Sequence, residues 1–327
     1  MTTRRERTIK FNIKILKDWS KHFWDFIQNI YEDEFKYGSY LYPDPNLACN
    51  YLLLSVNINL SWEIIKNNQH LDWYIGHISK NQCITWEIIQ NNPEINWDYH
   101  NISRNPNITW DIIQNNPDID WSWNYVAENP NITWEIIQTN PDKLSSGWNL
   151  SRNPNITWEI IQNNPQINWD YSQLSYHHNI TWDIVKGSGN DKIWHWGYLS
   201  INPNITWDIV KDNPDKNWCY TSLSINPNIT WEIIKENSHL PWDYTWVIEN
   251  PNLTFETILT SPEFYDINWY NVCCNKFTKE KELFIIQKYK EYLSAYRIQQ
   301  WWFKITMSPY TKIGKKFIEK RRLEALI

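Results

Sequence analysis

Acidic side chains recur at one position along this chain, directly after an aromatic residue, and paired carboxylates can act as general acid and general base. Eight successive copies are present: Glu63, Glu87, Asp111, Glu135, Glu159, Asp183, Asp208 and Glu232. A carboxylate in the first turn of a helix also interacts favourably with the helix dipole. This structural role accounts for all eight residues, so we expect none of them to be catalytic.

Other groups that could carry chemistry do not form a recognisable pattern. The 8 His occupy unrelated positions, and metal-ligand spacings of Cys and His are absent. Cys273 and Cys274 are adjacent, and we expect them to be a buried pair on a helix rather than metal ligands. The run from Lys186 to Gly189 lacks the spacing of a phosphate-binding loop. The sequence therefore predicts a protein that is not an enzyme, without a metal or cofactor site.

The acidic positions belong to a tandem repeat that reads Asn-Pro-Asn-Ile-Thr-Trp-Asp/Glu-Ile-Ile. Its anchor aromatic residues are Trp62, Trp86, Trp110, Trp134, Trp158, Trp182, Trp207, Trp231 and Phe255, and seven of the eight steps between them are 24 residues long. A second Trp follows 11 or 12 residues after most anchors, for example Trp97 after Trp86. Ser145 stands where one copy of this second Trp is expected, and Trp148 follows it. A fixed period of this length is typical of repeats that bury their apolar faces against one another.

Each repeat reads as two short helices. Thr85 is suited to cap the first helix, and Ile84 and Ile89 have the spacing of a hydrophobic staple around the cap. Pro93 stops this helix, because the residue before proline avoids the helical conformation. Asn96 then caps a second helix, with Trp97 and Ile102 as its expected buried residues.

The sequence thus predicts an all-α protein, an α-solenoid of about nine 24-residue helix-turn-helix repeats with helical caps. Stacked helices lie about 8–10 Å apart, which predicts a rod or arc of about 80 Å. The alternative is a β-containing solenoid like leucine-rich repeats, because Ile84 to Ile88 also alternates apolar and polar residues.

Composition and charge divide the chain into three parts. Residues 1–56 form an N-terminal helical cap with a degenerate repeat at Phe23 to Gln28, residues 57–275 form the repeats, and residues 276–327 form a basic helical C-terminal cap or tail. The repeats carry 10 Lys/Arg against 25 Asp/Glu, and the C-terminal part carries 13 against 5. This asymmetry opposes binding of nucleic acid by the repeats and leaves it open for the tail.

Two surfaces are candidates for binding a partner. If the repeats stack in register, the carboxylates that follow the anchor Trp form a ridge. In the C-terminal repeats a Lys that can neutralise the carboxylate follows three residues later (Lys186, Lys211 and Lys235), whereas the central repeats have Gln there. The expected docking ridge for a basic partner is therefore Glu87, Asp111, Glu135 and Glu159. The expected basic tail segment is Lys312, Lys315, Lys316, Lys320, Arg321 and Arg322. We predict a scaffold that mediates protein–protein interaction; the alternative is binding of nucleic acid or an anionic surface through the tail.

The repeat, with its intervening Leu-Ser-x-Asn-Pro (Leu199 to Pro203, Leu223 to Pro227), resembles the Trp- and Asn-rich repeat proteins of giant DNA viruses of amoebae. The resemblance covers residues 57–275 and extends to the Ile-Gln-x-Trp-Trp run of the tail. It implies a viral source, but it carries over no activity and no functional residue. An Asn- and Ile-rich composition agrees with an A/T-rich coding genome.

The cellular setting follows from smaller signals. The N-terminus has no apolar signal segment, and no run of the sequence is long enough to span a bilayer. The 5 Cys are odd in number and unrelated to the repeat. These features predict an intracellular, reducing location, in infected-cell cytoplasm or the virus particle, and the Asn-x-Thr triplets are then by-products of the repeat.

Overall fold

A computed structural model describes residues 4–37, 51–189, 193–264, 269–308 and 310–324 of the protein. All regular secondary structure in these ranges is helical, which confirms the all-α repeat prediction and rules out the β-containing alternative there. The chain divides into two compact units, Ser20–Glu280 and a smaller unit of Met1–Trp19 with Lys281–Ile327.

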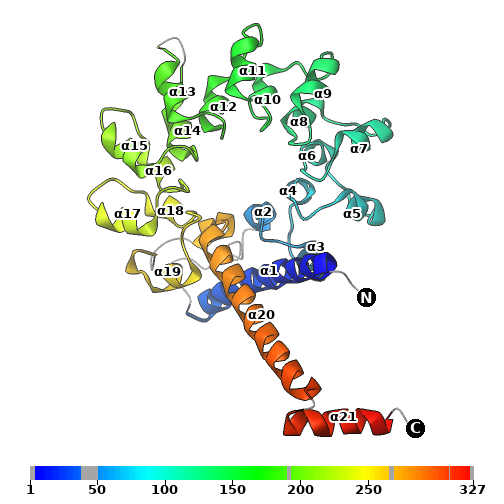
Figure 1. The fold of residues 1–327 in the computed structure, drawn as a ribbon. Coiled ribbons are helices and arrows are strands. Elements are labelled where there is room, and N and C mark those ends of the chain that lie inside the picture. The colour runs from blue at the N-terminus through cyan, green and yellow to red at the C-terminus, as the bar shows by residue number, and fades with distance from the viewer. Residues whose placement is uncertain (1–3, 38–50, 190–192, 265–268, 309, 325–327) are drawn as a thin grey trace. The chain divides into compact units, whose positions relative to one another are not determined.

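The larger unit consists of paired short helices, one outer and one inner in each repeat (Figure 1). The outer helices are α3 (Trp62–Asn67), α5 (Trp86–Asn91), α7 (Trp110–Asn115), α9 (Trp134–Thr139), α11 (Trp158–Asn163), α13 (Trp182–Gly187), α15 (Trp207–Asp212), α17 (Trp231–Glu236) and α19 (Phe255–Thr260). The inner helices are α2 (Tyr51–Leu54), α4 (Ile75–Ser79), α6 (Tyr99–Ile102), α8 (Trp123–Glu128), α10 (Gly147–Leu150), α12 (Tyr171–Tyr176), α14 (Trp196–Ile201), α16 (Tyr220–Leu223) and α18 (Tyr244–Val247). The 3₁₀ segments η2 (Pro262–Phe264) and η3 (Trp269–Cys274) follow α19.

The caps explain why each helix begins where it does. The Thr85 hydroxyl accepts a hydrogen bond from the Ile88 N–H at 3.3 Å, as predicted, and both staple residues Ile84 and Ile89 are buried. The predicted cap of the second helix is wrong by two residues. Asp98, rather than Asn96, caps α6, because its carboxylate accepts from the Asn101 N–H at 3.1 Å.

A buried Asn in each repeat joins it to the preceding repeat. Asn105 Nδ2 donates to the carbonyl oxygens of Ser79 (2.9 Å), Asn81 (3.0 Å) and Ile84 (3.2 Å), while its Oδ1 accepts from the Asn107 N–H (2.8 Å). The same position is occupied by Asn57, Asn81, Asn105, Asn129, Asn153, His177, Asn202, Asn226, Asn250 and Asn275, all buried. We call this series the Asn ladder. It satisfies backbone carbonyls that short helices leave without partners.

A parallel series of serines completes the junctions. The Ser79 hydroxyl oxygen accepts from the Asp98 N–H at 3.0 Å, and Ser103 does the same for the Ser122 N–H. Ser103 also donates back to the Tyr99 carbonyl at 2.8 Å. These serines join their repeats to the next through main-chain groups as well as by apolar packing, whereas Ala127 and Ile248 occupy the position in two repeats and cannot form the bond.

The Asn ladder closes on itself, so the repeats of the larger unit form a ring rather than the rod or arc expected from helix stacking. Asn57 Nδ2 donates to the carbonyls of Cys273 (2.7 Å) and Asn275 (2.9 Å), and Asn59 Nδ2 donates to that of Lys276 (2.9 Å). These bonds join positions more than 210 residues apart and repeat the pattern seen between neighbouring repeats (Figure 1).

Part of α1 (Arg4–Tyr37) packs into the ring where it closes. The Trp24 ring lies 6.0 Å from that of Trp73, and Phe26 stacks on Phe255 at 3.7 Å and contacts Phe277. Trp24 thus takes the place of an anchor Trp. This geometry supports the interpretation of Phe23 to Gln28 as a degenerate first helix of a repeat.

Aromatic pairs fill the space between neighbouring repeats. Six anchor Trp residues contact the second Trp of the next repeat, as in Trp86 with Trp121 at 6.1 Å, whereas Trp110 contacts Trp123 and Trp231 contacts Phe264. Trp97 and Trp121 are buried, whereas the anchors Trp86, Trp110 and Trp134 are only half-buried. Burial varies along both series, because the anchors Trp182, Trp231 and Phe255 are buried, whereas Trp73, Trp194 and Trp218 at the second position are only half-buried.

The smaller unit holds the start of α1, most of α20 (Thr278–Met307) and α21 (Lys312–Glu324). The Phe11 ring lies 5.4 Å from that of Tyr289 and 4.3 Å from that of Tyr292, and Tyr289 donates to Asn12. None of the helices that the structure describes is both long and apolar enough to span a membrane.

Candidate protein-docking surface

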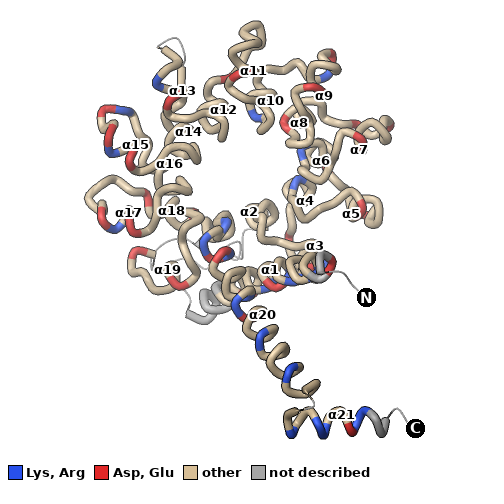
Figure 2. Tube along the Cα trace, viewed as in Figure 1, with Lys and Arg blue, Asp and Glu red and all other residues tan. Residues whose placement is uncertain are grey.

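The predicted docking ridge lies on the outer helices. Glu87, Asp111, Glu135 and Glu159 are the second residues of α5, α7, α9 and α11, and all four side chains are exposed. The Thr cap and the helix start fix each carboxylate in the first turn, so successive repeats present it in the same way (Figure 2). We call these four residues the acidic ridge.

The acidic ridge differs from the carboxylates of the following repeats in its pairing. Asp183 is paired with Lys186 and Asp208 with Lys211, each at 2.9 Å. Glu232 lies 4.0 Å from Lys279, and hydrogen bonding by its own backbone N–H and the Thr230 hydroxyl lowers the pKa of Glu232. Within the described part of the chain, no cation lies within ion-pair distance of the four ridge carboxylates.

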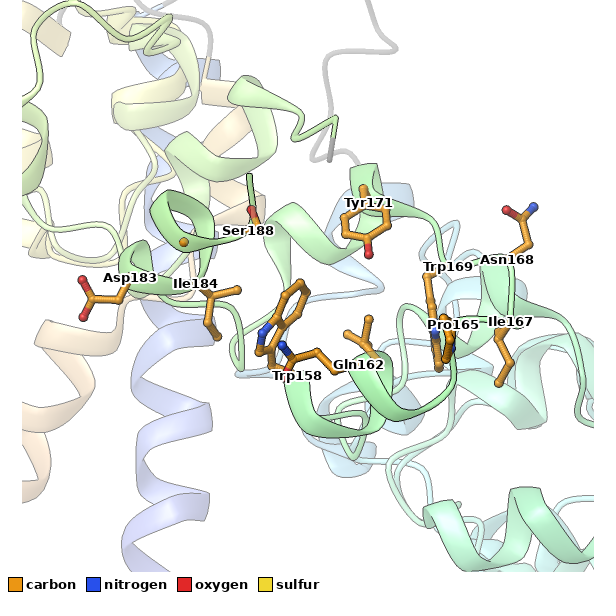
Figure 3. Close-up of a pocket in the computed structure, with 12 residues that line it drawn as sticks. Trp158, Gln162, Pro165, Ile167, Asn168, Trp169, Tyr171, Asp183, Ile184 and Ser188 are labelled. Atoms are coloured by element: carbon orange, nitrogen blue, oxygen red, sulfur yellow. The ribbon is translucent and has the colours of Figure 1, made fainter. Parts of the chain in front are cut away.

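A groove with a mixed polar and apolar lining adjoins the ridge where α11 meets α13 (Figure 3). It has a volume of about 840 Å³. Its apolar lining includes Trp158, Pro165, Trp169 and Ile184, and its polar lining includes Gln162, Asn168, Asp183 and Ser188. This junction belongs to the 25-residue repeat, in which Trp194 donates to the Ser188 hydroxyl (2.9 Å) instead of to the backbone carbonyl used elsewhere. The groove can accommodate an apolar side chain beside exposed carboxylates.

A charged cluster on the inner helices was not found by sequence reasoning. Glu128 is nearly buried, and its carboxylate oxygens lie 3.8 Å from Arg104 and 3.5 Å from Arg152. Burial raises the pKa of Glu128 even though both arginines lie beside it. The signal was present, since Arg104, Glu128 and Arg152 are spaced by 24 residues and each directly precedes an Asn of the ladder. The cluster joins three successive repeats through one carboxylate.

The arginines of this cluster are also held by aromatic rings. The Arg104 guanidinium lies 4.3 Å from the Tyr125 ring centre, and that of Arg152 lies 4.2 Å from the ring centre of Trp148. Arg104 donates to Asn101, and Arg152 donates to Gln173. Because their donors are used within the protein, we assign these arginines a structural role.

The predicted basic tail segment lies on α21. Lys312, Lys315, Lys316, Lys320 and Arg321 are exposed, and the Arg321 guanidinium lies 5.3 Å from the Phe317 ring centre. The side chain of Arg322 lies outside the described residues. The structure does not bring this segment together with the acidic ridge in one compact unit.

Buried titratable groups occur elsewhere in the ring. Burial raises the pKa of Glu249 to about 7, and burial together with the nearby Glu249 charge raises the pKa of the Cys274 thiol to about 12. A thiol with so high a pKa is a poor nucleophile at neutral pH. Among the residues described, no group of three or more His, Cys, Asp or Glu has the arrangement of a metal site.

Comparison with known proteins gave no match to a family model, to a curated protein or to a solved structure.

Proposed function

We propose that the protein is a non-enzymatic scaffold that binds a basic protein partner along its outer surface. The observation that carries this proposal is the acidic ridge, four exposed carboxylates on consecutive outer helices without cationic partners in the described structure. A closed ring holds such a row in a fixed arrangement, which reduces the entropy lost when an extended partner binds. The α11–α13 groove would take an apolar side chain of the same partner.

The proposed setting is intracellular and reducing, and the proposed source is viral. The first rests on the scattered, odd-numbered cysteines, and the second rests on the resemblance of the repeats alone. Infected-cell cytoplasm and the virus particle both suit a scaffold of this kind.

The test compares the partner proteins that co-purify from the native host with the wild type and with two charge-reversed variants. D111K/E135K/E159K removes the acidic ridge. E94K/D118K/D142K changes the net charge equally, at exposed acids in the loops of neighbouring repeats. We expect the ridge variant to lose the partners that wild type and the loop variant retain. Retention of every partner by the ridge variant would contradict the proposal.

A further inference from the structure

The distal half of α20 exposes large apolar side chains on most of its circumference. Ile298 is 64 % exposed, Trp301 60 %, Trp302 52 % and Phe303 56 %. Three consecutive aromatic residues cover about 200° of a helix, because successive residues are rotated by about 100°. Helix α1 contacts Tyr289 and Tyr292, and none of the described residues covers this aromatic run. An apolar surface of this kind marks an interaction site.

The charges of the same segment have one sign. Between Tyr292 and Ile318 the sequence carries five cations, Arg297, Lys304, Lys312, Lys315 and Lys316, and no acid. Arg297 and Lys304 are seven residues apart, which places them on one stripe of α20, roughly opposite Trp302. The helix therefore has a narrow cationic stripe and a wide face of Trp, Phe and Ile.

Helix α21 keeps its cations close to the aromatic run. The Thr311 hydroxyl donates to the Ile305 carbonyl, and it accepts from the Gly314 N–H at 2.9 Å. A Cβ at Gly314 would clash with the carbonyl oxygens of Ser308 and Ile305, so the close approach of α21 to the end of α20 requires glycine. The turn thus fixes Lys312, Lys315 and Lys316 beside the end of α20.

The combination favours one partner among the candidates. A second copy of the chain would bring two segments of charge +5 together, which like-charge repulsion opposes. Nucleic acid would use the cations and stack on the aromatic rings, but it gives Ile298 and Met307 no apolar environment. Exposed Trp, Phe and Ile interleaved with Lys and Arg are the features by which helices bind at an anionic lipid surface.

We propose that residues 292–318, comprising the distal part of α20 and the first half of α21, bind the surface of an anionic phospholipid bilayer. Trp301, Trp302 and Phe303 enter the boundary between headgroups and acyl chains. Arg297, Lys304 and the α21 lysines pair with the lipid phosphates. This inference is independent of the acidic ridge and of its partner.

The experiment is flotation of the full-length protein with two kinds of vesicle. One kind contains phosphatidylcholine alone, and the other also contains about 30 % phosphatidylserine, which makes its surface strongly anionic. Two variants probe the segment, W301S/W302S/F303S and K312E/K315E/K316E. Their matched controls are W148S/W246S, which removes exposed aromatics from the ring, and K66E/K211E/K235E, which makes three equal reversals on outer helices. Circular dichroism checks that each variant is folded.

We expect binding to the anionic vesicles, an at least tenfold loss of affinity in both segment variants, and little change in the controls. Raising the salt concentration should weaken binding of the wild type. Two outcomes would overturn the inference. One is failure of the wild type to float with anionic vesicles, whether or not it binds single-stranded DNA or forms dimers. The other is equal loss of binding in the control variants.

Discussion

At the scale of single residues, the Asn of each repeat joins neighbouring repeats more directly than the conspicuous Trp does. Its amide donates to carbonyls of the preceding repeat, and its carbonyl oxygen accepts from the chain two residues later. The sequence displays the Asn at every repeat but one, yet it does not reveal that the side chain is buried, because Asn is usually exposed or located in turns. The Thr cap was predictable from the sequence, because its hydroxyl bonds to a backbone N–H only three residues later in the chain.

His177 is the exception in the Asn ladder. Its Nε2 donates to the Asn153 carbonyl at 2.9 Å and its Nδ1 accepts from the Asn179 N–H at 3.2 Å, an arrangement that requires the neutral ring. Burial lowers the pKa of His177 below its ordinary 6.5. As the pH falls below about 6.5, the unfolded chain therefore takes up a proton that the folded ring resists, and stability decreases.

The substitution H177N should stabilise the protein, and more at pH 5 than at pH 8. Asn restores the additional carbonyl contacts made elsewhere in the ladder, a gain of about 1 kcal/mol at neutral pH. Thermal unfolding across this pH range measures the effect. An unchanged acid sensitivity in H177N would show that His177 does not limit stability.

Glu249 should have the opposite pH dependence. Its pKa is raised to about 7 from 4.5, so its contribution to stability is present below about pH 4.5 and is lost as the pH rises through 7. E249Q should unfold at a higher temperature than the wild type at pH 8 and at a similar temperature at pH 4. Because the side chain is partly exposed, we expect only about 1 kcal/mol after allowing for solvent screening. Equal melting temperatures at pH 8 would contradict the shift.

At the scale of elements, the helices and their period followed from the sequence, but the depth of their side chains did not. Periodicity identifies both Trp positions without distinguishing them. In space, the second Trp is held by a hydrogen bond to the end of the preceding helix, as in Trp169 Nε1 to the Asn164 carbonyl at 3.0 Å. Where Ser145 replaces that Trp, Leu144 is buried, while Trp148 points to solvent with 47 % exposure and does not replace it.

Trp169, at the second Trp position, and Trp134, at an anchor position, should differ in their contribution to stability. Trp169 is 7 % exposed, so W169A should cost about 3–5 kcal/mol, whereas W134A, at a half-buried anchor, should cost about 2 kcal/mol. W169F keeps most of the apolar area and should lose about 1 kcal/mol with the hydrogen bond. Urea unfolding gives the comparison. A larger loss in W134A than in W169A would reverse the assigned roles.

At the scale of the whole repeat unit, closure of the ring could not be predicted from the number and length of the repeats. A small constant rotation between repeats decides whether an array stays open or closes, and sequence period does not report that rotation. Closure also depends on contacts between distant segments, such as Phe26 on Phe255. The acidic ridge was predictable, because N-terminal carboxylates of equivalent helices must face the same way. The Arg104–Glu128–Arg152 cluster shows its 24-residue spacing in the sequence, but the contacts among the three side chains follow only from the placement of the inner helices.

Photo-crosslinking from residue 58 tests ring closure most directly. Ile58 lies between Asn57 and Asn59, whose amides bond to the carbonyls of Asn275 and Lys276, and its own side chain is 37 % exposed. With p-benzoylphenylalanine at position 58, irradiation and peptide mass spectrometry should detect an intramolecular crosslink to the segment around residues 273–276. An open rod would separate these positions by about 80 Å. Crosslinks confined to the neighbouring repeat around Gln82 would contradict the closed ring.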